Sequence, residues 1–344
     1  MLIIVTTGPK SNKKSELKKL INTGADIIRL NSFHIPDCDF ERIIKDVRLI
    51  NQNTQIMQDL SGQKIRVSSK LNFTMKLYID EKVTFCTEDA YDNDIKNLQY
   101  GGKKIIPLNI TKTFNIDNPK TISIKDNTML FDIISFEENK IITKSKTGGI
   151  IRAGKGCNIK GLKRKSEITE TDKKEIELGI KNKVDIILQS YVESMADIEK
   201  VKKYIKDTLK SEYIPSIWAK IESKRGIDNC LDIIKSCDGI LIGRGDMIAE
   251  TSILKVPFYQ NYIISMAKKY NKKIIIGTNV LNSMKSNMVP TLPEIEAIYN
   301  SINKGTDGFM LAGETSVSVN PSNTVKYLNK IINTYNKQIK VGVK

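Results

Sequence analysis

The feature that most constrains this chain is a repeated alternation of short apolar runs with amphipathic segments. The order is strand, helix, strand, helix, strand up to about residue 66, and the alternation returns from about residue 170. The apolar runs are short and rich in isoleucine, which is typical of strands buried in a parallel sheet. Three predicted strands come before the interruption and five come after it. Eight strand–helix units predict an α/β chain of the (β/α)8, or TIM, barrel class.

The stretch that interrupts this alternation has a different pattern. From about Val67 to Ala153, short apolar and polar runs are separated by Asn, Asp and Gly, and no long helical periodicity is present. This pattern is typical of short strands joined by turns. We therefore expect a small all-β domain, residues 67–153, inserted after the third strand of a barrel formed by residues 1–66 and 154–344.

Polar side chains follow most of the predicted strands at the point where each strand ends. In a (β/α)8 barrel these ends meet at one rim, where catalytic groups are found. In the stretch 216–246, for example, Lys220 and Glu222 follow one strand and Asp246 follows the next. Two carboxylates beside a lysine indicate a divalent metal next to an anionic substrate, although ordinary loop charge explains this stretch alone equally well. The side chains expected at the rim are Thr6, Arg29, Asn31, Asp59, Lys220, Glu222, Asp246, Thr278 and Glu314.

The net charge restricts the class of partner. The chain has 55 Lys and Arg against 39 Asp and Glu, a formal net charge of +16, which favours anionic partners such as nucleotides or phosphorylated metabolites. Lys, Ile and Asn are abundant throughout, so codon bias is an alternative cause of the excess. No basic stripe is interleaved with aromatic residues, and we expect no nucleic-acid partner.

Other residue counts exclude several kinds of site. The five cysteines form no Cys-x-x-Cys pair, which indicates neither a disulfide framework nor a zinc site and fits a reducing cytoplasm. The single histidine, His34, excludes a histidine-based triad or a multi-histidine metal site. The chain starts in a predicted strand, and no apolar run approaches the ~20 residues of a membrane helix, so we expect neither a leader nor a membrane span.

A set of short motifs, in one order along the chain, resembles the pyruvate kinase family. Each motif is short, but together they extend from residue 2 to about residue 330, which makes the resemblance specific. The motifs are Ile4–Pro9, Arg29–Asn31, Asp59 with Gly62 and Ile65–Arg66, Gly148–Gly149 with Lys155–Asn158, Ala219–Glu222, Asp238–Leu241 with Arg244–Asp246, Ser283–Met284, Pro290–Thr291, and Met310–Leu311 with Gly313–Thr315.

The resemblance implies an enzyme that transfers a phosphoryl group from phosphoenolpyruvate to ADP with Mg²⁺ or Mn²⁺. Glu222 and Asp246 would hold the cation together with substrate oxygens and water. Lys220 would stabilise the charge that develops on the transferred group, and Arg29 would bind the phosphate. Thr278 would lie near the face of the enolate that is protonated to pyruvate.

The resemblance also implies residues on the substrate and nucleotide side. Lys155 would be brought in by the inserted domain, which suggests a lid that closes to exclude water. For His34, a structural hydrogen bond is as good an interpretation as ligand contact. The matching positions are Pro9, Asn31, His34, Arg66, Lys155, Gly245 and Asp246.

One departure from the family pattern concerns a monovalent cation. Many members bind this cation through Ser and Thr near Asp59, with a Glu in the following segment. Phe33 and Leu60 take the places of the two hydroxyl residues, and Lys64 takes the place of the glutamate. We predict that the Lys64 ammonium near Asp59 substitutes for the cation and that potassium is not required. The alternative is a Lys64 side chain that points into solvent.

Further departures concern the substrate pocket and the assembly. Met247 and Ile248 follow Asp246 where the family has a glycine-containing segment, so the pocket is expected to differ. Asn279 and Leu292 replace a usual Gln and Arg. Only a short tail, 336–344, follows the last predicted helix, so we expect no C-terminal effector domain and a monomer or dimer rather than the usual tetramer.

Three functions fit these observations. The first is pyruvate kinase activity in the cytoplasm. The second is a repurposed member that acts on a different enol phosphate, carboxylate or nucleotide, which Ile248 favours. The third is a catalytically weak barrel with a binding or regulatory role, which the retained Lys220, Glu222 and Asp246 argue against.

Overall fold

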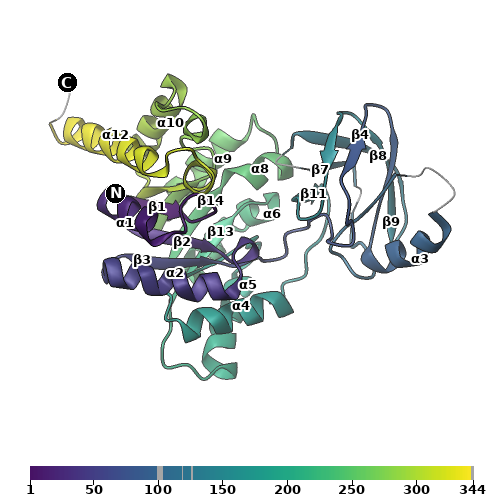
Figure 1. Cartoon of the computed structure of the whole chain (residues 1–344), viewed down its shortest axis with the longest axis horizontal. Helices are drawn as coiled ribbons and strands as arrows, with labels where there is room; N and C mark the ends of the chain where they lie inside the picture. The colour runs from purple at the N-terminus through teal and green to yellow at the C-terminus, as the bar shows by residue number, and fades with distance from the viewer. Residues whose placement is uncertain (99–103, 118, 125–126, 342–344) are drawn as a thin grey trace. The chain divides into compact units, whose positions relative to one another are not determined.

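The computed structural model describes residues 1–98, 104–117, 119–124 and 127–341. The chain forms two compact units, and Figure 1 labels many of their elements. The barrel unit consists of Met1–Gly62, Ser166–Gly245 and Leu254–Lys344. The insertion unit consists of Gln63–Lys165 and Asp246–Ile253, and it contains the predicted inserted segment 67–153.

Eight strands close the barrel unit. They are β1 (Leu2–Thr6), β2 (Ile27–Asn31), β3 (Gln55–Asp59), β12 (Ile186–Gln189), β13 (Ser216–Ile221), β14 (Gly239–Gly243), β15 (Lys273–Gly277) and β16 (Gly308–Leu311). Their order is β1-β16-β15-β14-β13-β12-β3-β2, and every neighbouring pair is parallel. The predicted (β/α)8 barrel is therefore confirmed, and the carboxyl ends of all eight strands share one rim.

Buried apolar side chains fill the interior of the barrel, and every strand contributes to this cluster. The members are Ile4, Ile27, Met57, Ile186, Leu188, Trp218, Leu241, Ile275 and Met310. The indole of Trp218 packs directly on Gly239 of the neighbouring strand, where an added Cβ would lie 2.4 Å from the ring. The largest interior side chain thus requires a glycine opposite it.

Helices cover the outside of the strands in the barrel unit (Figure 1). The helix predicted at 227–235 forms as two pieces separated at Asn229, and the last helix continues well past the predicted end at Ile332. The helices are α1 (Lys14–Asn22), α2 (Asp37–Ile50), α4 (Glu170–Lys181), α5 (Met195–Lys203), α6 (Lys224–Asp228), α7 (Cys230–Ser236), α9 (Val256–Lys269), α10 (Leu292–Asn303), α11 (Gly313–Ser316) and α12 (Pro321–Val341), with short turns η1 (Ser32–His34), η2 (Tyr204–Thr208) and η3 (Asn282–Lys285). A further helix, α8 (Arg244–Glu250), begins in the barrel unit and continues into the insertion unit. In the described residues, none of the helices has both the length and the apolar content needed to cross a membrane.

The insertion unit is rich in β-structure, as predicted. A six-stranded sheet has the order β11-β7-β8-β9-β5-β6, and β10 pairs with β4 in a second, two-stranded sheet. Its core includes Phe85 and Phe131, whose rings meet edge to face at 5.0 Å. The strands are β4 (Met75–Leu77), β5 (Lys82–Cys86), β6 (Lys104–Pro107), β7 (Thr121–Ile124), β8 (Met129–Phe136), β9 (Lys140–Ser145), β10 (Gly149–Ile151) and β11 (Cys157–Ile159).

The insertion unit also contains one helix that the sequence did not predict, α3 (Glu88–Leu98). Its sequence is dominated by Asp, Asn and Glu, so the apolar positions that give helical periodicity are few. Ala90 and Tyr91 are nevertheless buried against Cys86 and Ile105. Tertiary packing therefore decides the conformation where local periodicity is weak.

Candidate active site

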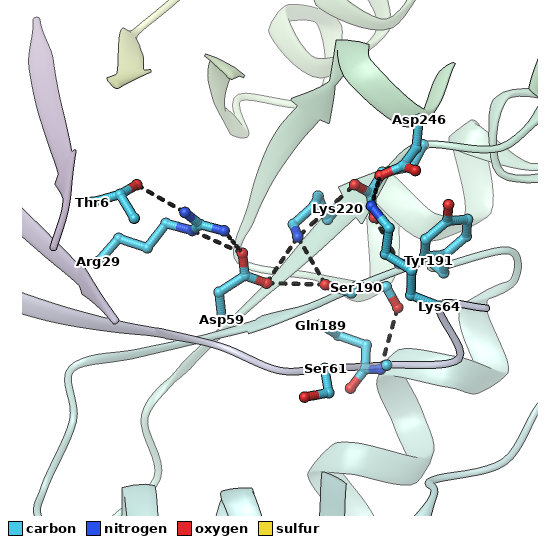
Figure 2. A network of polar contacts seen from close by, with 12 residues as sticks. Thr6, Arg29, Asp59, Ser61, Lys64, Gln189, Ser190, Tyr191, Lys220 and Asp246 are labelled. Carbon is cyan, nitrogen blue, oxygen red and sulfur yellow. Dashed lines mark hydrogen bonds and ion pairs between the residues drawn. The ribbon is translucent and has the colours of Figure 1, made fainter. Parts of the chain in front are cut away.

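A buried carboxylate joins two cationic side chains at the rim of the barrel. Asp59, at the end of β3, accepts a hydrogen bond from Arg29 Nε through Oδ2 at 2.8 Å and a second from Arg29 Nη2. Its Oδ1 lies 2.8 Å from Lys220 Nζ on β13 (Figure 2). The remaining Arg29 nitrogen, Nη1, donates to Thr6 Oγ1 at 2.8 Å. The structure thus brings together Arg29, Asp59 and Lys220, as the strand-end pattern predicted.

A serine that the sequence analysis missed completes this cluster. Ser190 Oγ donates to Asp59 Oδ1 at 2.9 Å and accepts from Lys220 Nζ at 2.8 Å (Figure 2). Ser190 directly follows β12 and is 6% exposed. The rule that polar residues at strand ends form the site identifies Ser190 as well. The fourth barrel strand contributes no other residue to the predicted rim.

The charge of Asp59 is maintained by its neighbours. Burial opposes ionisation of this carboxyl, but the charges of Arg29 and Lys220 hold its pKa below the usual value. The carboxylate is therefore ionised at neutral pH and fixes both cations in place. Such an arrangement presents positive charge at a water-poor site, which suits the binding of a phosphoryl group.

Glu222 directly follows β13, two residues beyond Lys220. It is 4% exposed, and its Oε2 accepts the Tyr191 N–H at 3.1 Å. Its Oε1 lies 3.9 Å from Lys220 Nζ. A Cβ at Gly243 would lie 2.6 Å from Glu222 Oε1, so glycine at the end of β14 makes room for this carboxylate.

Thr278 and its neighbour have an unusual backbone. Thr278 has φ +68° and Asn279 has φ +55°, directly after β15. Left-handed φ is rare for a β-branched residue and costs on the order of 1–3 kcal/mol per residue. Gly245 approaches this turn closely, since a Cβ there would lie 3.1 Å from the Thr278 methyl group.

Four of the predicted site residues belong to the insertion unit. Within it, Lys64 Nζ lies 2.6 Å from Asp246 Oδ2, with the two side chains 20% and 9% exposed (Figure 2). Arg66 Nη1 donates to Gly154 O at 3.2 Å, and Lys155 O accepts the Val67 N–H at 2.9 Å. Lys64 therefore does not point into solvent.

The other predicted positions lie on loops of the barrel unit. Pro9 is exposed, Asn31 ends β2 and pairs in register with Asp59, and His34 is exposed in η1. The His34 ring meets Phe33 edge to face at 4.9 Å. These contacts assign no chemical role to the three residues.

The carboxylate oxygens of Glu222 and Asp246 are the type of ligand that a hard divalent cation prefers. Glu222 belongs to the barrel unit and Asp246 to the insertion unit. Within the described ranges, no group of three or more His, Cys, Asp or Glu side chains could hold a metal alone. Mg²⁺ commonly uses one or two protein carboxylates and takes its other oxygen ligands from water and substrate phosphate, so either carboxylate is a ligand of the kind this ion uses.

Two further carboxylates hold the loop that follows β3. Glu175 accepts hydrogen bonds from Ser61 Oγ at 2.5 Å and from Ser61 N–H at 2.8 Å. Asp172 accepts the Gly62 N–H at 2.8 Å and also caps α4 through Thr169. Burial raises the pKa of Glu175 to about 7, although the bonds from Ser61 lower it.

The raised pKa of Glu175 predicts a pH-dependent stability. The ordinary value is 4.5, so between about pH 4.5 and 7 the folded chain holds a proton that the unfolded chain loses, and stability falls as pH rises. Glu175→Gln is expected to remove this slope and to raise the free energy of unfolding above pH 7 by up to about 3 kcal/mol. Urea unfolding from pH 4.5 to 8.5 measures this, with exposed Glu177→Gln as the control. A native slope in E175Q would contradict the prediction.

Comparisons with known proteins assign the chain to a family. The family model described as "Pyruvate kinase, barrel domain" matches residues 1–325. The chain is 29% identical to a pyruvate kinase of Thermotoga maritima, over 98% of this chain and 71% of that protein. It is 30% identical to one of Mycoplasma genitalium (92% and 63%) and 29% identical to one of Thermoplasma acidophilum (96% and 57%). The chain thus spans 57% to 71% of the length of these relatives. Because the family model matches residues 1–325, the chain belongs to the pyruvate kinase family.

Proposed function

We propose that this protein transfers the phosphoryl group of phosphoenolpyruvate to ADP, with formation of pyruvate and ATP. The observation that carries the proposal is the buried cluster in which Asp59 holds Arg29 and Lys220 at the rim of the barrel. Two fixed cations in a water-poor site stabilise charge on a phosphoryl group without reorganisation, and phosphoryl transfer depends mainly on such positioning.

Each residue has a defined task in this reaction. Arg29 binds the phosphate, and the Lys220 ammonium stabilises the charge that develops on the transferred group. Asp59 and Ser190 orient the lysine. A divalent cation held by Glu222 and Asp246 would neutralise phosphate charge when bound. Thr278 acts on the side of the enolate that receives a proton.

The nucleotide and the cellular setting are part of the same proposal. Pro9, Asn31, His34, Arg66, Lys155 and Gly245 serve the nucleotide and substrate side. Four of the five cysteines are buried, which suits a reducing cytoplasm. We also propose a monomer or dimer, which light scattering of the purified protein measures directly.

The position of Lys64 supports potassium-independent activity. Its side chain is 20% exposed, and its ammonium is paired with Asp246, a proposed cation ligand. A fixed positive charge from the chain removes the need for a monovalent cation. We expect activity in sodium or tetramethylammonium buffer to stay within about twofold of that in potassium, since the charge is already supplied.

Variants at Lys64 give a matched test of the same prediction. Lys64→Met should lower activity and make the remainder respond to potassium, while Lys163→Met, at an exposed lysine paired with Asp117, should do neither. Strong dependence of the unmodified protein on potassium would show that the prediction is wrong.

The alternative of a different substrate rests on Met247 and Ile248. Both lie in α8, where Met247 is fully buried and Ile248 is partly buried. Side chains at these positions leave the backbone less accessible to a substrate carboxylate than glycine would. An assay with other enol phosphates in place of phosphoenolpyruvate distinguishes this function from the first.

A further inference from the structure

The turn that carries Thr278 has a backbone conformation that threonine disfavours. Thr278 and Asn279 both have left-handed φ, +68° and +55°, and neither is glycine. A β-branched residue keeps such a conformation only where the surrounding structure imposes it. The residues that impose it therefore control where the Thr278 side chain points.

Arg244 is the principal partner of this turn. Its Nη2 donates to Thr278 O at 2.7 Å and to Asn279 O at 2.8 Å, and its Nε donates to Thr278 O at 3.0 Å. A longer contact joins Nε to Gly277 O at 3.4 Å. One guanidinium thus donates hydrogen bonds to the carbonyl groups of three successive residues, and the backbone becomes left-handed within these three residues.

Glu314 holds the residue that follows the left-handed turn. Its Oε1 accepts the Val280 N–H at 3.0 Å, and its Oε2 accepts the Ala312 N–H at 2.9 Å. Burial lowers the pKa of Arg244 to about 10, and the charge of Glu314 raises it, so the guanidinium is ionised at neutral pH. Charged donors make stronger hydrogen bonds to carbonyl groups than neutral ones do.

The side chain of Thr278 is left available by this arrangement. Within the described part of the chain its hydroxyl makes no hydrogen bond, and the residue is partly exposed. All the hydrogen bonds of Thr278 to Arg244 involve its carbonyl group. The backbone is therefore fixed while the hydroxyl remains free for a ligand.

We propose that Arg244 is a positioning residue, whose guanidinium holds the left-handed turn at 278–279 and so directs the Thr278 hydroxyl toward the substrate. The catalytic consequence rests on the proposed function, in which Thr278 serves the protonation of the enolate. The effect on the backbone does not depend on that function.

Arg244→Met tests both parts. It removes all the donors, so hydrogen–deuterium exchange of segment 273–284 should become at least about tenfold faster. kcat for pyruvate formation should fall by about 10- to 100-fold with KM for phosphoenolpyruvate changed less than about threefold, because the loss concerns orientation rather than phosphate binding. Exchange of the pyruvate methyl protons with solvent deuterium, followed by NMR, should fall in parallel.

Two further variants separate positioning from general damage. Arg42→Met is the matched control, since exposed Arg42 also donates to a backbone carbonyl, that of Asn12 at 3.0 Å, but in a turn without left-handed residues. Asn279→Gly introduces a residue that adopts left-handed φ readily. When it is added to R244M, kcat of the double variant should be at least about threefold higher than kcat of R244M alone. Native exchange of segment 273–284 in R244M would overturn the proposal. An inactive unmodified protein with faster exchange in R244M would contradict the proposed function and leave the backbone role supported.

Discussion

Lys220→Met is expected to reduce kcat for pyruvate formation by about 10³-fold or more, because it removes the cation that faces the transferred phosphoryl group. The fold should survive, since Asp59 remains paired with Arg29 and methionine fills most of the volume of the lysine chain. A coupled assay and thermal unfolding measure the two effects.

A second lysine provides the control for this variant. Lys268 is about half exposed and pairs with Asp307, so Lys268→Met should leave both kcat and unfolding unchanged. Retention of more than about a tenth of the activity by K220M would remove Lys220 from the proposed mechanism.

Asp59→Asn is expected to produce the largest loss of stability. The change leaves the buried cations Arg29 and Lys220, with side chains 7% and 11% exposed, without their shared carboxylate. Removal of one partner from a buried ion pair costs about 3–5 kcal/mol. Activity should fall as well, since neither cation keeps its orientation.

The pH dependence of D59N provides an internal check. The pKa of Asp59 is held below its ordinary value of 3.8, so its contribution to stability is present above that pH and disappears as pH falls through the lower folded value. The difference between D59N and the unmodified protein, measured by urea unfolding, should therefore shrink only below about pH 4. Asp228→Asn, at an exposed pair with Lys224, should cost less than about 1 kcal/mol. Equal losses in the two variants would contradict the role of Asp59.

The barrel was predictable because its strands carry a strong local signal. Runs such as Ile3 to Val5 and Ile274 to Ile276 are apolar, short and separated by amphipathic helices, so their number and order follow from periodicity. The strand-end rule also places Arg29, Asp59 and Lys220 at one rim. The rule needs no knowledge of side-chain geometry.

Features that depend on tertiary contacts were not predictable. Helix α3 has little periodicity and forms where Ala90 and Tyr91 pack on a strand. The left-handed turn at Thr278 has no local sequence signature, because threonine ordinarily avoids that conformation. Its partner Arg244 lies more than thirty positions earlier in the chain. Ser190 differs from these features, because the rule for strand ends applies to it without knowledge of tertiary contacts.

The central claim is tested most directly by pyruvate formation from phosphoenolpyruvate and ADP, coupled to lactate dehydrogenase. The account predicts turnover that requires a divalent cation, proceeds in sodium or tetramethylammonium buffer, and is lost in Lys220→Met. Absence of pyruvate formation by the folded, unmodified protein with every nucleoside diphosphate, in the presence of Mg²⁺ or Mn²⁺, would contradict it.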